Sequence, residues 1–169
     1  AGNVAVGYRA LVANTIGQNN IAIGSGSLAT NVDGDKNIAI GTEALTVYEP
    51  GDGDGANVAI VHHSGKALTT SNFNTLVGYE SGKTLTTASG STFFGTSTGA
   101  TVTTGNMNIA LGYDAMNGAA TTGDNNIAIG TSAGDAITSG YENTLIGRFA
   151  GGAINTGQGN VAIGIQTGL

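Results

Sequence analysis

Two segments of the sequence place a serine in the Gly-x-Ser-x-Gly pattern that holds the nucleophile of many hydrolases. They span Gly95–Gly99 and Gly130–Gly134. A serine nucleophile needs a histidine as general base and a carboxylate that orients this histidine. The only histidines are the adjacent pair His62 and His63, and no carboxylate cluster recurs at a fixed phase. We therefore expect no catalytic residues and no enzymatic activity.

A glycine- and aspartate-rich segment, Glu49–Gly55, offers a second kind of chemistry. Carboxylate and carbonyl oxygens are the ligands of Ca²⁺, so Asp52 and Asp54 are candidate calcium ligands. The favoured interpretation is an acidic loop that bulges from the surface.

The histidine pair directly follows Val61, which occupies a position where the neighbouring segments have glycine. Three copies of one histidine near a symmetry axis could bind a metal ion or an anion. A surface variant without a ligand is the favoured alternative for His62 and His63.

Aromatic and cationic side chains recur at one phase of the sequence, at Tyr8, Tyr79, Tyr113 and Arg148. Exposed along a rigid surface, they could bind a glycan or a protein receptor. The favoured alternative is that they pack locally over a turn. With His62 and His63 they form the candidate ligand surface.

One segment, Gly24–Ala29, imitates the glycine pattern of dinucleotide-binding turns. That pattern needs a following helix in a βαβ unit, for which the chain has no room. We therefore expect no cofactor.

Composition limits the classes of protein to which the chain can belong. Of 169 residues, 30 are glycine and only 37 are Leu, Ile, Val or Phe, close to the minimum with which a chain builds a core. Five Lys and Arg stand against 11 Asp and Glu, which argues against nucleic-acid binding. No apolar run is long enough to insert into a membrane, and no signal peptide opens the chain, so we expect a mature or excised fragment.

An internal repeat organises the whole sequence as one domain over residues 1–169. Its core is an asparagine, three mostly apolar residues and a glycine, and its period is 17 residues apart from two insertions. Ten copies begin at residues 3, 20, 37, 57, 74, 91, 108, 126, 143 and 160, and Ser91 takes the place of the asparagine in one of them.

The repeat predicts an all-β fold. A 17-residue period is too short for a βαβ unit, a propeller blade or a helical repeat, but suits one coil of a parallel β-solenoid. Ten coils stacked about 4.8 Å apart would form a rod of roughly 48 Å. The recurring asparagines would stack as a ladder along one edge and satisfy each other's amides.

Two positions of the repeat exchange side-chain volume. Four copies with alanine at the strand centre carry leucine or methionine eight residues after the asparagine, as in Ala39 and Leu45. Other copies reverse this order, as in Phe93 and Gly99. Ala128 with Gly134 and Ala162 with Gly168 depart from this pattern, so it is a tendency. Such exchange predicts that both positions share one interior space.

Both faces of the short strands carry apolar or small side chains. A 17-residue coil is too thin to cover both faces by itself, so we expect several chains to associate side by side. A cyclic homotrimer is the natural closure for a fibre.

The segments NVAVG, NIAIG and NVAIG resemble the head repeats of trimeric autotransporter adhesins of the YadA type. The longer copies NTLVGYESG and NTLIGRFAG are similar to repeats of phage tail fibres and other trimeric surface fibres. The resemblance spans the whole chain and implies a left-handed β-roll trimer. The chain departs from an intact autotransporter in its longer repeat and in lacking a coiled-coil stalk and an anchor.

The resemblance implies an extracellular segment of a cell-surface or virion fibre that binds a glycan or protein receptor. A structural spacer that projects a binding tip located elsewhere is the alternative. A third and weaker alternative is ice binding, because Thr84, Thr86, Thr101 and Thr103 form two stacked T-x-T pairs.

Overall fold

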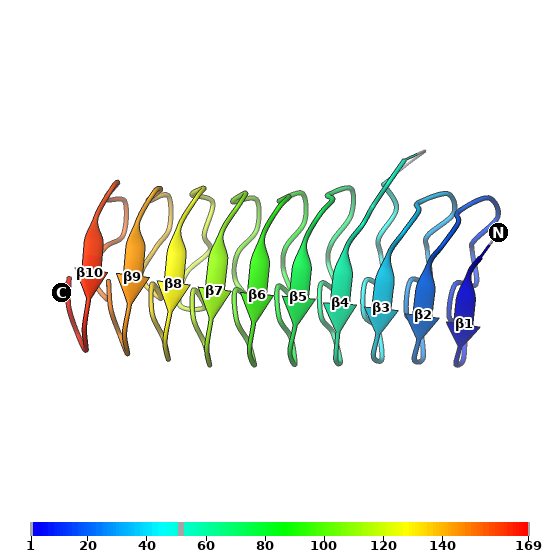
Figure 1. The fold of residues 1–169 in the computed structure, drawn as a ribbon, viewed down its shortest axis with the longest axis horizontal. Coiled ribbons are helices and arrows are strands. Elements are labelled where there is room, and N and C mark those ends of the chain that lie inside the picture. Colours follow the sequence, from blue (N-terminus) through cyan, green and yellow to red (C-terminus); the bar gives the residue numbers. More distant parts are fainter. Residues whose placement is uncertain (1, 51–52, 169) are drawn as a thin grey trace.

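The computed structural model describes residues 2–50 and 53–168 and shows a single β-solenoid (Figure 1). Within these residues the chain forms strands and turns and contains no helix, hence none that could cross a membrane. Each coil contributes one strand of three residues. The strands are β1 (Val4–Val6), β2 (Ile21–Ile23), β3 (Ile38–Ile40), β4 (Val58–Ile60), β5 (Thr75–Val77), β6 (Thr92–Phe94), β7 (Ile109–Leu111), β8 (Ile127–Ile129), β9 (Thr144–Ile146) and β10 (Val161–Ile163).

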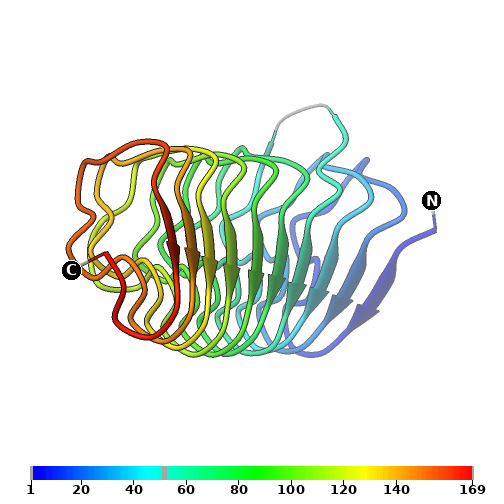
Figure 2. The same ribbon diagram turned by 60° about the vertical axis from the view of Figure 1, so that its left-hand side comes forward.

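The ten strands form one parallel sheet in sequence order, β1 to β10. Equivalent residues of successive copies pair directly, for example Ala22 with Ala39. This register holds across both insertions, so the extra residues are absorbed in turns. Figures 1 and 2 show the resulting rod, with the two termini at opposite ends. The predicted all-β fold and parallel β-solenoid are confirmed.

The central residue of each strand points into the rod and its two neighbours point outward, because side chains alternate along a strand. The inward residues of β2 to β9 are completely buried, whether small like Ala128 or large like Phe93. The few large apolar side chains are therefore concentrated in one narrow interior that runs the length of the rod.

The expected asparagine ladder is present, and it lies inside the coils. The Oδ1 atom of Asn20 accepts hydrogen bonds from the backbone N–H of Asn37 (2.9 Å) and from its side-chain amide (3.1 Å). In most coils the amide also donates to a turn carbonyl, as Asn126 does to Gly140 (2.9 Å). Since an unpaired buried amide is costly, the ladder fixes the register between coils.

The predicted shared interior space is confirmed. A methyl group added at Gly99 would lie 2.5 Å from Cε2 of Phe93, and one added at Gly151 would lie 2.5 Å from Cδ1 of Leu145. These distances show that the strand centre and the residue eight positions after the asparagine fill the same space.

Four positions of every coil adopt a left-handed backbone conformation, with φ between +46° and +141°. They are the residue before the repeat asparagine and those four, six and eight positions after it. Glycine suits such positions, but residues such as Leu28 and Glu43 also adopt them. The strain is tolerated because the coils above and below hold each turn in place.

Threonine hydroxyls tie neighbouring coils together. Thr69 donates to the carbonyl of Thr86 (3.1 Å), Thr86 to that of Thr103 (3.1 Å) and Thr84 to that of Ala100 (2.7 Å). The hydroxyls of the T-x-T pairs are thus engaged with the backbone of the next coil.

Candidate functional site

The sheet ends at a tight corner, and the candidate ligand residues lie on the far side of it. A glycine ends nine of the ten strands and, in all of these coils but the last, lies against the next coil: a methyl group on Gly78 would collide with the carbonyl oxygen of Gly95. The following two residues face outward and form two parallel columns along the rod. We call them corner column A, five residues after each repeat asparagine, and corner column B, six residues after it.

Corner column A contains five of the six candidate ligand residues: Tyr8, His62, Tyr79, Tyr113 and Arg148. Within the described residues, only His62 and Tyr79 of this column are in ring contact with each other, because the other three belong to coils that are not adjacent. The imidazole of His62 stacks on the Tyr79 ring with centroids 5.6 Å apart. The guanidinium of Arg148 lies 4.8 Å from the centre of the Phe149 ring.

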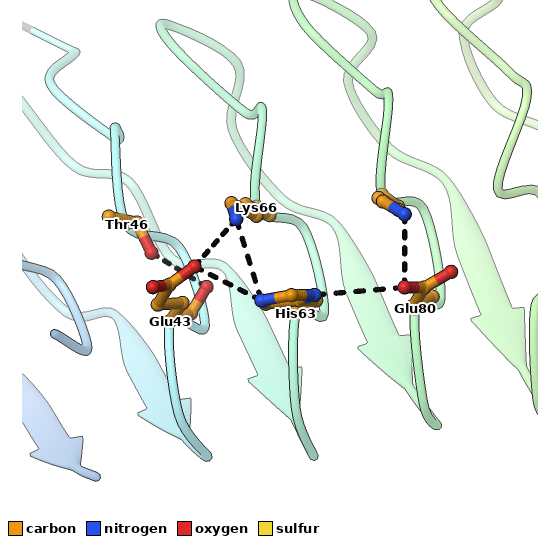
Figure 3. A network of polar contacts seen from close by, with 6 residues as sticks. Glu43, Thr46, His63, Lys66 and Glu80 are labelled. Atoms are coloured by element: carbon orange, nitrogen blue, oxygen red, sulfur yellow. Dashed lines mark hydrogen bonds and ion pairs between the residues drawn. The ribbon is translucent and has the colours of Figure 1, made fainter. Parts of the chain in front are cut away.

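The sixth candidate, His63, lies in corner column B at the centre of a charged network (Figure 3). Its Nε2 atom is 3.0 Å from Oε2 of Glu43 in the preceding coil, and its Nδ1 atom is 3.7 Å from Oε1 of Glu80 in the following coil. Lys66 Nζ lies 2.6 Å from the same Glu43 oxygen, and Lys83 Nζ lies 2.9 Å from Glu80 Oε1. Three coils are linked by these contacts.

The lysines hold both carboxylates in the charged form. The Lys66 ammonium lowers the pKa of Glu43, mainly through its hydrogen bond, and His63 adds to this effect. The Lys83 ammonium likewise lowers the pKa of Glu80 through a hydrogen bond. The hydroxyl of Thr46 donates to the carbonyl of Glu43 (2.7 Å) and steadies the corner from which this glutamate projects.

Sequence reasoning found His63 but missed its partners Glu43, Glu80, Lys66 and Lys83. Their charges look scattered in the sequence. They meet because the glutamates share corner column B, while the lysines lie nine residues after the repeat asparagine in adjacent coils. Sorting the charged residues by repeat phase would have revealed the network.

The described residues contain no group of three or more His, Cys, Asp or Glu side chains arranged to hold a metal ion. Asp54, one of the two calcium candidates, forms an ion pair with Lys36 (Nζ–Oδ2 2.6 Å). Asp52 lies outside the described residues. The His63 imidazole lies between the Glu43 and Glu80 carboxylates, with its Nε2 atom at hydrogen-bond distance from Glu43.

The two serines of the hydrolase-like segments, Ser97 and Ser132, both lie in corner column B with left-handed backbone conformation. Each serine N–H donates to the carbonyl of a corner tyrosine in the preceding coil, Tyr79 or Tyr113, at 2.8 and 3.0 Å. A turn follows each serine in place of the helix that a nucleophile elbow requires.

Two shallow depressions lie near the network. The first, of about 390 Å³, is lined by Val47, Ala67, Thr84 and the stems of Lys66 and Lys83. The second, of about 320 Å³, lies over coils 1 to 3, and Tyr8, Arg9 and Glu43 are among its lining residues. Glu43 therefore belongs both to the charged network and to the second depression.

The arrangement offers an elongated outer corner with aromatic, charged and hydroxyl groups, suited to noncovalent binding. Comparison with protein-family models, with curated proteins and with solved structures finds no match to this chain.

Proposed function

We propose that this chain is an adhesive or receptor-binding segment of a homotrimeric surface fibre, folded as a left-handed β-roll and exposed outside a cell or on a virion tail. The observation that carries the proposal is the apolar outer face of the sheet. The other supports are the stiff repeating interior and the ligand-like side chains of the two corner columns.

The outer face of the sheet consists of the first and last residues of β1 to β10. Most are Val, Ile, Leu or Phe, and in the single chain they remain exposed or half-buried. Phe94 and Leu111, from adjacent coils, are 55% and 43% exposed. Soluble monomers rarely present a contiguous apolar surface of this kind without a partner.

Sister chains are the partner that fits this face best. Its side chains repeat with the period of the rod, and an identical rod laid alongside presents the same period. A cyclic arrangement of three would bring each sheet face to a common axis and leave the corner columns on the outside. The proposal thus assigns assembly to the sheet and ligand binding to the corners.

The mass of the particle in solution tests the assembly. Light scattering on the purified chain should give three times the mass of one chain, 16.5 kDa. Leu111→Glu should dissociate the trimer, because a carboxylate would be buried against an apolar partner surface. Val47→Glu is the matched control: Val47 is similarly exposed, at 41%, but lies away from the sheet, so its variant should remain trimeric. A wild-type mass of one chain would refute the trimer.

Receptor binding is tested separately on arrays of glycans and extracellular-matrix proteins. An adhesive segment should retain specific array ligands, and mutation of the corner columns should weaken their binding. A blank result with intact trimer would instead favour a structural spacer.

A further inference from the structure

Corner column B has one gap in its row of side chains. Nine of its ten positions carry a side chain, but coil 2 has Gly26. The column reads Arg9, Gly26, Glu43, His63, Glu80, Ser97, Asp114, Ser132, Phe149 and Gln166. The packing does not require this glycine, since an added methyl group would meet only Cγ of Glu43, at an ordinary 3.5 Å.

The missing side chain opens the second depression described above, which we call the Gly26 notch. It is lined by Tyr8, Arg9, Ser25, Gly26, Thr30 and Glu43, together with neighbouring small residues. Its volume of about 320 Å³ lies at the lower end of the range typical of small-molecule sites.

Three different chemical groups face this small space. Tyr8 is 75% exposed and lines the notch, to which it can offer the apolar face of an aromatic ring. Arg9 and Glu43 lie two coils apart, one on each side of Gly26, and provide hydrogen-bond donors and acceptors. Lys66 and His63 hold Oε2 of Glu43 from the side of coil 4, so the carboxylate is positioned before any ligand arrives.

Hydroxyl groups complete the set. The Thr30 hydroxyl donates its hydrogen to the carbonyls of Thr46 (3.1 Å) and Tyr48 (3.3 Å), so toward the notch it can act only as an acceptor. The notch therefore combines an aromatic face, a cationic donor, an anionic acceptor and a hydroxyl acceptor. A ligand that matches it needs an apolar face and several hydroxyl groups that both donate and accept.

We propose that the Gly26 notch binds one pyranose ring of a surface saccharide. The C–H face of the sugar would stack on Tyr8, its hydroxyls would donate to Glu43 and Thr30, and Arg9 would donate to a ring substituent. This inference rests on the proposed receptor-binding function and names the class of ligand and the place where it binds.

The test measures saccharide binding to the intact chain by NMR titration with a panel of methyl hexopyranosides and free hexuronic acids. Binding of the neutral sugars would indicate that Arg9 donates to a sugar hydroxyl. Binding of the hexuronic acids alone would indicate that it pairs with a carboxylate. Gly26→Gln should fill the notch and weaken binding at least about tenfold, and Tyr8→Ala should have a similar effect. The fold should tolerate glutamine, because Gln166 occupies the same position of the last coil with φ of 54°.

Ser97→Gln is the matched control, because it adds the same side chain to the same column four coils away, at φ of 54°. Its affinity should equal that of the unmodified chain. The proposal is overturned if no sugar of the panel binds, or if Gly26→Gln binds as tightly as the control. Retained binding to receptor arrays by Gly26→Gln would then show that the chain is adhesive through another surface.

Discussion

At the scale of single residues, Val61 is a strained position of the chain. It stands where the other nine coils have glycine, and its φ of +92° lies in a region that β-branched residues avoid. Its side chain is 42% exposed, so little burial compensates for the strain. The valine is accommodated because the flanking coils fix the corner, with the Val61 N–H donating to the Ile40 carbonyl at 2.6 Å.

We expect Val61→Gly to stabilise the protein. Relief of the backbone strain should raise the free energy of unfolding by about 1–3 kcal/mol. The greater conformational entropy of glycine in the unfolded chain offsets part of this, so the net increase should be about 1 kcal/mol. The measurement is the urea midpoint at fixed protein concentration. Val58→Gly, inside strand β4, is the control and should lower the midpoint. A lower midpoint for Val61→Gly would show that the valine side chain makes a stabilising contact.

The charged network illustrates why residue-level chemistry depends on stacking. Glu43, His63 and Glu80 are 17 to 20 residues apart in sequence, yet their side chains meet in adjacent coils. Lys83 pairs with Glu80 inside one coil, but the contacts of Glu43 with His63 and Lys66 and of His63 with Glu80 arise only when the coils are in register. The complete network therefore depends on the stacking of coils 3 to 5.

At the scale of the coil, much of the fold could be predicted from the sequence. The strand positions, the asparagine ladder and the shared space of Phe93 and Gly99 all follow from residues that recur at fixed phases. Recurrence reports what every coil needs, such as an inward side chain or a buried amide partner.

Two kinds of feature could not be predicted from the sequence. One is a backbone conformation that has no typical residue, and the other is a feature present in a single coil. The left-handed conformation of Leu28 and Leu45 has no signal, because leucine is not typical of positive φ. The Gly26 notch was missed for the opposite reason: glycine is so common in this chain that one more attracts no attention. Its meaning appears only beside Arg9 and Glu43 in the adjacent coils.

The shared interior space predicts strong coupling between Phe93 and Gly99. Phe93→Ala should cost about 3–5 kcal/mol by leaving a cavity, and Gly99→Leu about 1–3 kcal/mol or more by overpacking. The double variant recreates the pairing of Ala39 with Leu45, and Leu45 tolerates φ of +49° where Gly99 has +60°. The combined loss should therefore be smaller than the sum of the single losses by at least about 1 kcal/mol.

The measurement is a double-mutant cycle. The free energy of unfolding is determined for the unmodified chain, the two single variants and the double variant, all at one protein concentration. As a control, Phe93→Ala combined with Gly151→Leu joins the same changes in coils that are three apart. Those losses should simply add. Additive losses for Phe93 and Gly99 themselves would mean that the two positions relax independently.

At the scale of the whole molecule, the rod is a one-dimensional stack in which each coil contacts its two neighbours. Every pair of adjacent strands shares the same register, and strands further apart share no ladder. Stability should then be close to a sum over coils and the interfaces between them. Assembly through the outer sheet face would add contacts between neighbouring chains, and these contacts would also repeat with each coil.

Because the coils stack in one dimension, deletion of one whole coil should destabilise the protein less than deletion of half a coil. Deletion of residues 143–159, which contain β9, joins Glu142 to Asn160 and lets β10 take the place of β9 in the ladder. The urea m-value should fall by about a tenth, because one coil in ten no longer exposes surface on unfolding.

Deletion of only eight residues, 147–154, removes the corner and the buried Ala150 but leaves β9, whose coil is then too short to close. We expect this shorter deletion to lower the urea midpoint more than the longer one, since the remnant of coil 9 either breaks the register or is expelled as a loop. The opposite order would show that the last two coils contribute little to the stack, in contrast to the continuous ladder that joins Asn126, Asn143 and Asn160.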